Sequence, residues 1–296
     1  MVSPQAGSLY SDNYEPEFED ELDLSSFTYA MESDPWYQQW LIKGIERMTG
    51  QLRIWKLYKE YRDETRAANE TFWHAACRKL ELTPQFDLSK LNKAPSDGPL
   101  VVVSNHPYGV LDGLILCYMM SYIRKDFKVL TNSVLTRSPE VKDNLLPVDF
   151  SETPQALQTN LTSRKLSRET LKNGGAVGVF PAGGVSRISK WSDKIAMDTS
   201  WQPFIGQLIR QSEACVLPLY FHGQNSRLFQ LASLASQTLR YSLYFKELAD
   251  HIGSNIKVEI GEPIAYKDLP SHSDNHDLMK KLYNITYSLP SQPATK

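Results

Sequence analysis

Apolar side chains between residues 34 and 61 recur at intervals of three and four positions, which is the spacing of an amphipathic helix. Asp34 and Pro35 predict where this helix begins, because aspartate caps a first turn and proline is tolerated at the first helical position. The stripe consists of Leu41, Ile45, Met48, Leu52 and Trp55. A second helix is predicted over residues 64–81.

Aromatic and basic side chains widen this stripe. The aromatic ones are Trp36, Tyr37, Trp40, Tyr58 and Tyr61, and the basic ones are Lys43, Arg47, Arg53, Lys56 and Lys59. Aromatic rings beside cations are typical of a helix that lies at a bilayer interface. An apolar stripe also lets a helix pack on a domain core. Both interpretations stay open, and one helix can serve both uses.

After the polar loop at residues 92–98, the helical period gives way to short, continuous apolar runs. Runs that are continuous rather than alternating indicate strands covered on both faces, as in a parallel sheet between helices. The predicted strands are 99–105, 127–130, 176–180, 214–221 and 255–260, and the helices between them are 113–123, 154–172, 200–212 and 226–251. The pattern predicts an α/β fold: a mostly parallel mixed sheet flanked by helices, with an N-terminal amphipathic helical pair.

Charge is unevenly distributed along the chain. The first 35 residues contain nine acidic side chains and no lysine or arginine. Because few apolar residues offset the entropy of ordering, residues 1–33 are predicted to form a disordered acidic tail. Residues 34–296 are predicted to form one domain, with the helical pair in 34–90 and the α/β core in 95–296. The body of the chain is basic, which favours anionic partners such as a phosphate group or a membrane surface.

Composition excludes several classes of protein. With 41% hydrophobic and 22% charged residues, the chain is neither collagen-like nor largely disordered. The three cysteines stand far apart and no histidine pair has metal-ligand spacing, so no metal is expected. No run of 18 apolar residues offers a membrane span, and no secretory leader is expected. A nucleic-acid partner is not expected either, because no basic stripe with stacking aromatics is present.

Two ionisable residues follow the first predicted strand, within SNHPYGVLDG at residues 104–113. His106 is placed at the carboxyl edge of the sheet, where open α/β sheets bind ligands, and Pro107 with Gly109 predicts a turn. Asp112 is predicted where the next helix begins, a position that favours a carboxylate. If the turn brings the two together, the carboxylate fixes the imidazole tautomer and the other ring nitrogen accepts a proton. The stretch predicts a general base, unless the histidine only satisfies the turn and the aspartate only caps the helix.

A glycine-rich loop, FPAGGVSR, follows the strand predicted at 176–180. Phe180 ends this strand and Pro181 turns the chain. The glycines let backbone N–H groups approach an anion, with a hydroxyl and a guanidinium next to them. Such a loop would hold a phosphate or the oxyanion of a thioester, or else form only a tight turn with a surface arginine. The residues concerned are Gly183, Gly184, Ser186 and Arg187.

Arg137 stands just before a predicted helix start at Ser138 and Pro139, and it either binds the phosphates of a donor or faces solvent.

No Gly-x-Ser-x-Gly elbow occurs, and none of the cysteines lies in such a turn, so no enzyme nucleophile is apparent. The acceptor itself would then act as the nucleophile.

These motifs resemble the PlsC-type lysophospholipid acyltransferases, the superfamily that includes the 1-acylglycerol-3-phosphate acyltransferases. NHPYGVLDG, VGVFPAGG and VLPLYFHG stand in the order of the family's Asn-His-x(4)-Asp, Phe-Pro-Glu-Gly and Val-x-Pro motifs. The resemblance implies the glycerolipid acyltransferase fold and transfer of a fatty acyl group, from acyl-CoA or acyl carrier protein, to a hydroxyl or amine of a lyso-lipid-like acceptor. It makes His106 the base and Asp112 its partner, and it implies that Asn105 and Gly113 shape the loop.

The chain departs from the family pattern at several positions. Five residues rather than four separate His106 from Asp112, which is similar to the haemolysin-labelled subgroup. Ala182 replaces the glutamate of the second motif, and Val185 stands where the family has an arginine. A further family arginine, which contacts glycerol phosphate, is expected near NLLPVDFSET, and none is there. These differences leave the acceptor open and argue against lysophosphatidic acid.

The resemblance and the aromatic helix together predict a peripheral acyltransferase on the cytoplasmic face of a membrane. The acyl-CoA or acyl carrier protein donor is a substrate, and no cofactor is expected. Two other functions stay open. A thioesterase or esterase would use the same dyad to activate water and would release fatty acid without an acceptor. An inactive membrane-associated protein would bind lipid without turnover.

Overall fold

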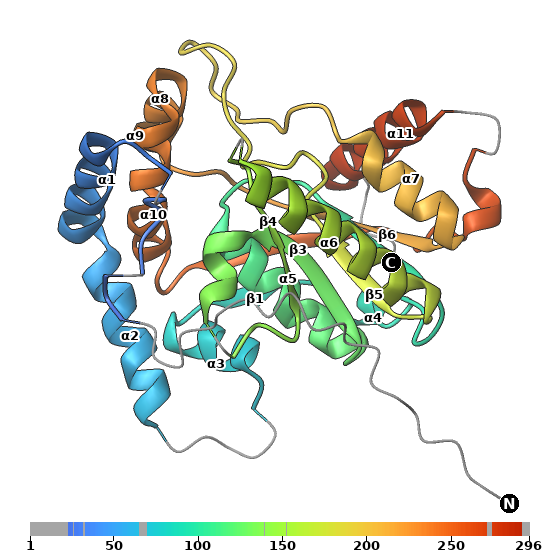
Figure 1. The fold of residues 1–296 in the computed structure, drawn as a ribbon. Helices are drawn as coiled ribbons and strands as arrows, with labels where there is room; N and C mark the ends of the chain where they lie inside the picture. Colours follow the sequence, from blue (N-terminus) through green and yellow to red (C-terminus); the bar gives the residue numbers. More distant parts are fainter. Residues whose placement is uncertain are drawn as a thin grey trace, which may run out of the picture.

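A seven-stranded sheet forms the centre of the molecule (Figure 1). The computed structural model describes residues 23–25, 27–31, 33–64, 70–138, 140–151, 153–270 and 274–291. The strands are β1 (Thr83–Gln85), β2 (Leu100–Ser104), β3 (Phe127–Asn132), β4 (Leu145–Val148), β5 (Ala176–Val179), β6 (Cys215–Phe221) and β7 (Asn255–Ile260), in the order β1-β7-β6-β2-β5-β3-β4. Neighbours pair in parallel except β6 and β7, so β1 and β7 run opposite to the other five.

Helices surround this sheet. They are α1 (Trp36–Thr49), α2 (Gln51–Asp63), α3 (Phe72–Lys79), α4 (Leu88–Leu91), α5 (Val110–Ile123), α6 (Pro154–Lys172), α7 (Pro203–Ser212), α8 (Arg227–Ala235), α9 (Gln237–Ser242), α10 (Tyr244–Asp250) and α11 (Asn275–Ser288), with 3-10 turns η1 (Ser133–Arg137), η2 (Tyr266–Asp268) and η3 (Leu289–Ser291). Within the described ranges, no helix combines the length and the apolar character that spanning a bilayer requires.

Successive residues of β2 point into two different cores. Leu100 and Val102 belong to one apolar cluster, Val101 and Val103 belong to the other, and none of the four has any exposed surface. Helices α3, α5 and α10 contribute side chains to the first cluster, and α6, α7 and α11 contribute to the second. Both faces of the sheet are therefore covered, which explains the continuous apolar runs and confirms the predicted fold class.

The N-terminal helix predicted over residues 34–61 is two helices, because the chain breaks at Gly50. A Cβ at Gly50 would lie 2.3 Å from the backbone oxygen of Phe245 in α10, so this close approach requires glycine. The predicted cap is also wrong. The carboxylate of Asp34 accepts the N–H of Met31 at 2.8 Å and makes no cap for α1.

Other predicted elements differ in extent. The segment 226–251 forms α8, α9 and α10 rather than one helix, and the hydroxyl of Ser236 accepts the N–H of Thr238 where α9 begins. The helix predicted over 64–81 occurs only as α3 in the described residues. The sequence does not predict β1, β4 or α11. Since β1 joins the sheet, the segment 34–90 supplies a strand as well as helices.

The predicted acidic tail, residues 1–33, lies mostly outside the described residues. In its described part, the ring of Tyr29 is buried against Tyr244 and Phe245, with centroids 4.8 and 5.5 Å apart. Such packing is not that of a disordered segment, so residues 27–31 belong to the folded part and the predicted boundary at residue 33 is wrong.

Candidate active site

His106 and Asp112 lie side by side at the carboxyl end of β2. Nδ1 of His106 is 3.0 Å from Oδ2 of Asp112. The Asp112 side chain is fully buried, and 16% of the His106 side chain is exposed. Because a carboxylate can only accept a hydrogen bond, Nδ1 carries the proton and donates a hydrogen bond to Asp112. This arrangement leaves the lone pair of Nε2 for a substrate.

The turn between the two residues accommodates five intervening positions through Gly109. This glycine has φ +90°, and a Cβ there would come within 3.2 Å of two side chains. The N–H groups of Tyr108 and Gly109 donate to Oδ2 of Asp112 at 2.7 and 2.9 Å. Since α5 begins at Val110, Asp112 lies inside the first turn of the helix, and the predicted start at residue 113 is too late. The carboxylate still faces N–H groups at the helix N-terminus.

Asn105 and Phe180 fix the position of the imidazole. The amide nitrogen of Asn105 donates to the backbone oxygen of Phe221 at 2.9 Å, and its Oδ1 accepts the N–H of Phe221 at 2.7 Å. These bonds fasten the end of β2 to β6. The ring of Phe180 stacks on His106, with centroids 3.9 Å apart and planes inclined by 20°.

A pocket of about 570 Å³ opens beside His106. Gly113 on α5 and the loop after β5 line it, the latter through Phe180, Pro181, Gly183 and Gly184. Ala182, which stands in place of the motif's glutamate, lines the pocket too. Asn105 does not line this pocket, so it acts on the strand end.

The glycine-rich loop presents fewer groups to the pocket than its sequence suggests. The N–H of Gly183 donates to the backbone oxygen of Phe180 at 3.0 Å, whereas that of Gly184 has no protein acceptor in the described structure. Ser186 is buried and Arg187 is exposed, and neither lines the pocket. The structure therefore does not bring the guanidinium of Arg187 to His106.

A second buried carboxylate, which the sequence does not predict, lies next to His106. Oδ1 of Asp198 accepts the backbone N–H of His106 at 3.2 Å and the hydroxyl of Ser186 at 2.5 Å, and Oδ2 accepts the indole N–H of Trp201 at 2.9 Å. Burial raises the pKa of Asp198 above its usual value, and the bonds from Ser186 and Trp201 oppose this rise. Asp198 thus fastens the glycine-rich loop to the strand end that carries His106.

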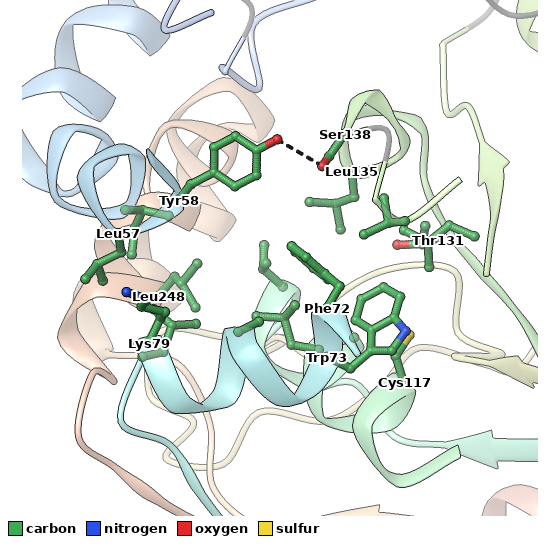
Figure 2. A pocket seen from close by; sticks show the side chains of 18 of the residues that line it. Leu57, Tyr58, Phe72, Trp73, Lys79, Cys117, Thr131, Leu135, Ser138 and Leu248 are labelled. Carbon is green, nitrogen blue, oxygen red and sulfur yellow. Dashed lines mark hydrogen bonds between the residues drawn. The ribbon is translucent and has the colours of Figure 1, made fainter. Parts of the chain in front are cut away.

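An apolar cavity of about 160 Å³ adjoins the pocket. The two share the residues Tyr29, Val110, Gly113, Thr131 and Leu135. Figure 2 shows Leu57, Phe72 and Leu248 among the side chains around it, and polar groups such as the Tyr58 hydroxyl, 3.2 Å from Oγ of Ser138, stand at its edge. The mostly apolar lining of this cavity suits a hydrocarbon chain.

The remaining candidate groups are Arg137, the three cysteines and a metal site. Arg137 ends η1, and its side chain is outside what the structure describes. Burial raises the pKa of the Cys77 thiol to about 12 and also raises the pKa of Cys117 and Cys215, so none of them is a ready thiolate. Over the described residues, no group of three His, Cys, Asp or Glu side chains is placed to hold a metal ion.

Comparison with known proteins identifies the family. A family model described as acyltransferase matches residues 53–291, most of the chain. The chain belongs to the acyltransferase family. This membership confirms the resemblance seen in the motifs and shows that the protein is an acyltransferase.

Two similar proteins are named lyso-glycine lipid O-acyltransferase. The one from Phocaeicola vulgatus is 25% identical over 224 residues, which cover 72% of this chain and 76% of the relative. The one from Bacteroides thetaiotaomicron is 24% identical over 225 residues, covering 72% and 78%. The crystal structure of the 1-acyl-sn-glycerophosphate acyltransferase PlsC from Thermotoga maritima superposes with a TM-score of 0.48 at 16% identity, over 92% of this chain and 86% of that one.

Proposed function

We propose that this acyltransferase moves a fatty acyl group from an acyl thioester to the hydroxyl of a lyso-lipid, with His106 as general base and Asp112 as its partner. One observation carries the proposal. His106 is held through Nδ1 by a buried carboxylate, and it lines a pocket that adjoins an apolar cavity. A base next to an apolar cavity suits chemistry on a fatty acyl group.

The reaction follows from this geometry in two steps. Nε2 of His106 takes the proton of the acceptor hydroxyl as its oxygen forms a bond to the thioester carbonyl carbon. The tetrahedral intermediate then breaks its C–S bond, and the imidazolium returns the proton to the leaving sulfur. The products are an ester and a free thiol. Asp112 stabilises the imidazolium through Nδ1, and the acceptor is the only nucleophile that the reaction needs.

The intermediate carries a negative oxygen, for which the glycine-rich loop offers a donor. Gly184 lines the pocket, and its N–H makes no hydrogen bond to another residue in the described structure, whereas that of Gly183 is bonded to Phe180. We therefore assign the oxyanion to Gly184 rather than to Arg187. One such donor contributes about 10²–10³-fold to the rate of an acyl transfer.

The acceptor that the relatives favour is a lyso-lipid built on glycine, since both are named for O-acylation of lyso-glycine lipid. The test is a panel of lyso-lipids incubated with palmitoyl-CoA and the protein, with products identified by mass spectrometry. We expect an O-acylated glycine lipid as the main product. A phospholipid or an amide as the main product would reject this acceptor.

The apolar cavity is proposed to hold the acyl chain, and Gly113 stands between it and the pocket. A Cβ at Gly113 would meet no atom within 4 Å, so Gly113→Leu extends into open space at this junction. We expect at least about tenfold slower transfer of palmitoyl groups and little change for octanoyl groups. Leucine favours a helix more than glycine by roughly 0.5–1 kcal/mol, so unfolding does not account for a loss.

Gly44→Leu on α1 is the matched control, because a Cβ there also meets no atom within 4 Å. Equal rates for both chain lengths in Gly113→Leu would place the acyl chain elsewhere. Rates are measured as thiol release from the two acyl-CoA donors.

The surface around α1 is proposed to rest on the cytoplasmic face of a membrane. On α1, 80% of Trp36, 74% of Trp40 and 87% of Met48 are exposed. Helix α8 packs on α9, which in turn lies against α1, and it adds exposed leucines at a three-residue spacing, which puts them on one face. These leucines are Leu228, Leu231 and Leu234. Exposed aromatic and apolar side chains on these two helices suit an interfacial position, whereas Tyr58 and Tyr61 on α2 line the cavity instead.

Replacing Trp36 and Trp40 with serine should weaken binding to vesicles of phosphatidylcholine and phosphatidylglycerol by about tenfold or more, because large apolar side chains then leave the interface. Co-sedimentation measures this change. A variant in which Leu88 and Leu157 are replaced with serine serves as control, because both side chains are exposed but lie on α4 and α6. Unchanged binding of the tryptophan variant would remove α1 from the contact.

The donor is proposed to be a thioester of coenzyme A or of acyl carrier protein, because both present the same reacting group. No cofactor is part of the proposed reaction, since attack, proton transfer and departure of the thiol use only His106, Asp112 and backbone donors.

A further inference from the structure

Two arginines from separate helices line the pocket that contains His106. Arg164 comes from α6 and Arg240 from α9. The guanidinium carbon of Arg164 lies 4.6 Å from the centroid of the Phe204 ring, and that of Arg240 lies 5.4 Å from the centroid of the Tyr241 ring. Stacking orients a guanidinium while leaving the N–H groups at its edges to donate. Both arginines are therefore held by aromatic rings and keep donors for another partner.

The positive charge of this pair is not neutralised by the pocket itself. Within the described part of the chain, neither arginine makes an ion pair, and Nε of Arg240 is buried without a hydrogen-bond partner. Apart from tyrosines, the other ionisable side chains that line the pocket are His106 and Asp149, and Asp149 accepts the N–H of Ser151 at 2.9 Å. Two guanidinium groups against one carboxylate leave an excess of positive charge. A buried unpaired donor is costly, so the site favours an anion that accepts from it.

We propose that Arg164 and Arg240 bind the anionic head of the acceptor, which is a free carboxylate in a lipid built on glycine. The inference rests on the proposed function and identifies where its acceptor binds. Glycine has no hydroxyl, so an O-acyl acceptor built on it carries the hydroxyl on its amide-linked chain and keeps the carboxylate free. A guanidinium pairs with a carboxylate through two parallel hydrogen bonds.

The separation between the anionic group and the reacting group within each substrate favours the acceptor over the donor as the source of this anion. In such an acceptor, a few bonds separate the carboxylate from a hydroxyl near the amide, so both fit in the pocket that holds His106. In acyl-CoA, the whole pantetheine arm separates the phosphates from the thioester. An anion bound in the same pocket as the reacting atoms therefore belongs to the acceptor.

The test is equilibrium binding of two short-chain probes to the full chain: N-(3-hydroxyoctanoyl)glycine and its neutral methyl ester. We expect the Kd of the carboxylate probe to rise about 10–100-fold in Arg164→Gln and in Arg240→Gln, as for a lost hydrogen bond to a charged group. The Kd of the ester should stay unchanged. Lys165→Gln is the matched control, because Lys165 follows Arg164 on α6, is exposed and does not line the pocket. Thermal unfolding identifies a variant that does not fold, and the other arginine then carries the test.

Several outcomes would overturn the inference. These are equal affinity of the parent protein for both probes, or an unchanged Kd of the carboxylate probe in the folded arginine variants. A raised KM for acyl-CoA without a change in that Kd would assign the pair to the donor. Tighter binding of a lysophosphatidic acid would assign it to phosphate heads. Because binding is measured without turnover, intact charge-dependent binding in a protein that transfers no acyl group would reject the proposed reaction and keep the anion site.

Discussion

Replacing His106 with alanine is expected to lower the rate of acyl transfer by about 10²–10⁴-fold, the range for a positioned general base. Without Nε2, Asp112 cannot take the proton of the acceptor in its place, because the Asp112 side chain is fully buried and does not line the pocket. The side chain of His106 is partly exposed, so its loss should leave the fold intact. Thiol release from palmitoyl-CoA in the presence of a hydroxyl acceptor measures the effect.

His276→Ala is the control for this experiment, because His276 is an exposed histidine on α11, outside the pocket. We expect the control to keep the parent rate. If His106→Ala also transfers acyl groups at the parent rate, the base is another group.

Asp112→Asn should cost about a hundredfold or more in kcat with little change in KM, because it removes the charge that stabilises the imidazolium. The substitution removes the charge of Asp112 and leaves its hydrogen bonds to the backbone in place. Oδ2 accepts all three hydrogen bonds to the carboxylate, whereas Oδ1 is buried without a partner in the described structure. An asparagine can place its oxygen at Oδ2 and keep the bonds from the N–H groups of Tyr108 and Gly109. Geometry is therefore retained and charge is lost.

Asp198→Asn is the comparison for this prediction. Asp198 is also a buried carboxylate beside His106, but it bonds to the backbone N–H of His106 and not to the imidazole. Steady-state kinetics and thermal unfolding of both variants separate the two roles. A kcat for Asp112→Asn within a factor of three of the parent would show that the carboxylate only shapes the turn.

The buried strands of this fold can be predicted from sequence, and the edge strands cannot. The predicted strands β2, β5 and β6 lie inside the sheet with both faces covered, so each is an almost continuous apolar run. In β7, buried apolar residues alternate with more exposed polar ones, and this alternation also marks a strand. The two missed strands, β1 and β4, are the ends of the sheet, and they contain Pro84 and Pro147. Proline cannot donate to a ladder and is commonest at sheet edges, and in these two short strands it interrupts the apolar pattern. The interior strand β6 also contains a proline, Pro218, but its longer apolar run still marks it as a strand.

The candidate site divides in a similar way. His106 and Asp112 follow a strand directly, and strand ends of a parallel sheet meet at one edge, so a local pattern identifies them. Asp198 reaches the same place through a long loop, and no motif marks it. Arg164 and Arg240 reach the pocket because α6 and α9 both border it. That relation depends on how helices pack, which no local pattern of residues encodes.

The most direct measurement counts the released thiol and the newly formed ester in parallel, with the parent protein and an acyl-CoA, in the presence and absence of a hydroxyl lipid. If an acceptor attacks the thioester with its proton taken by His106, thiol appears only with the lipid, and one ester forms for each thiol. Thiol released equally fast without the lipid, with free fatty acid as the product, would contradict the account.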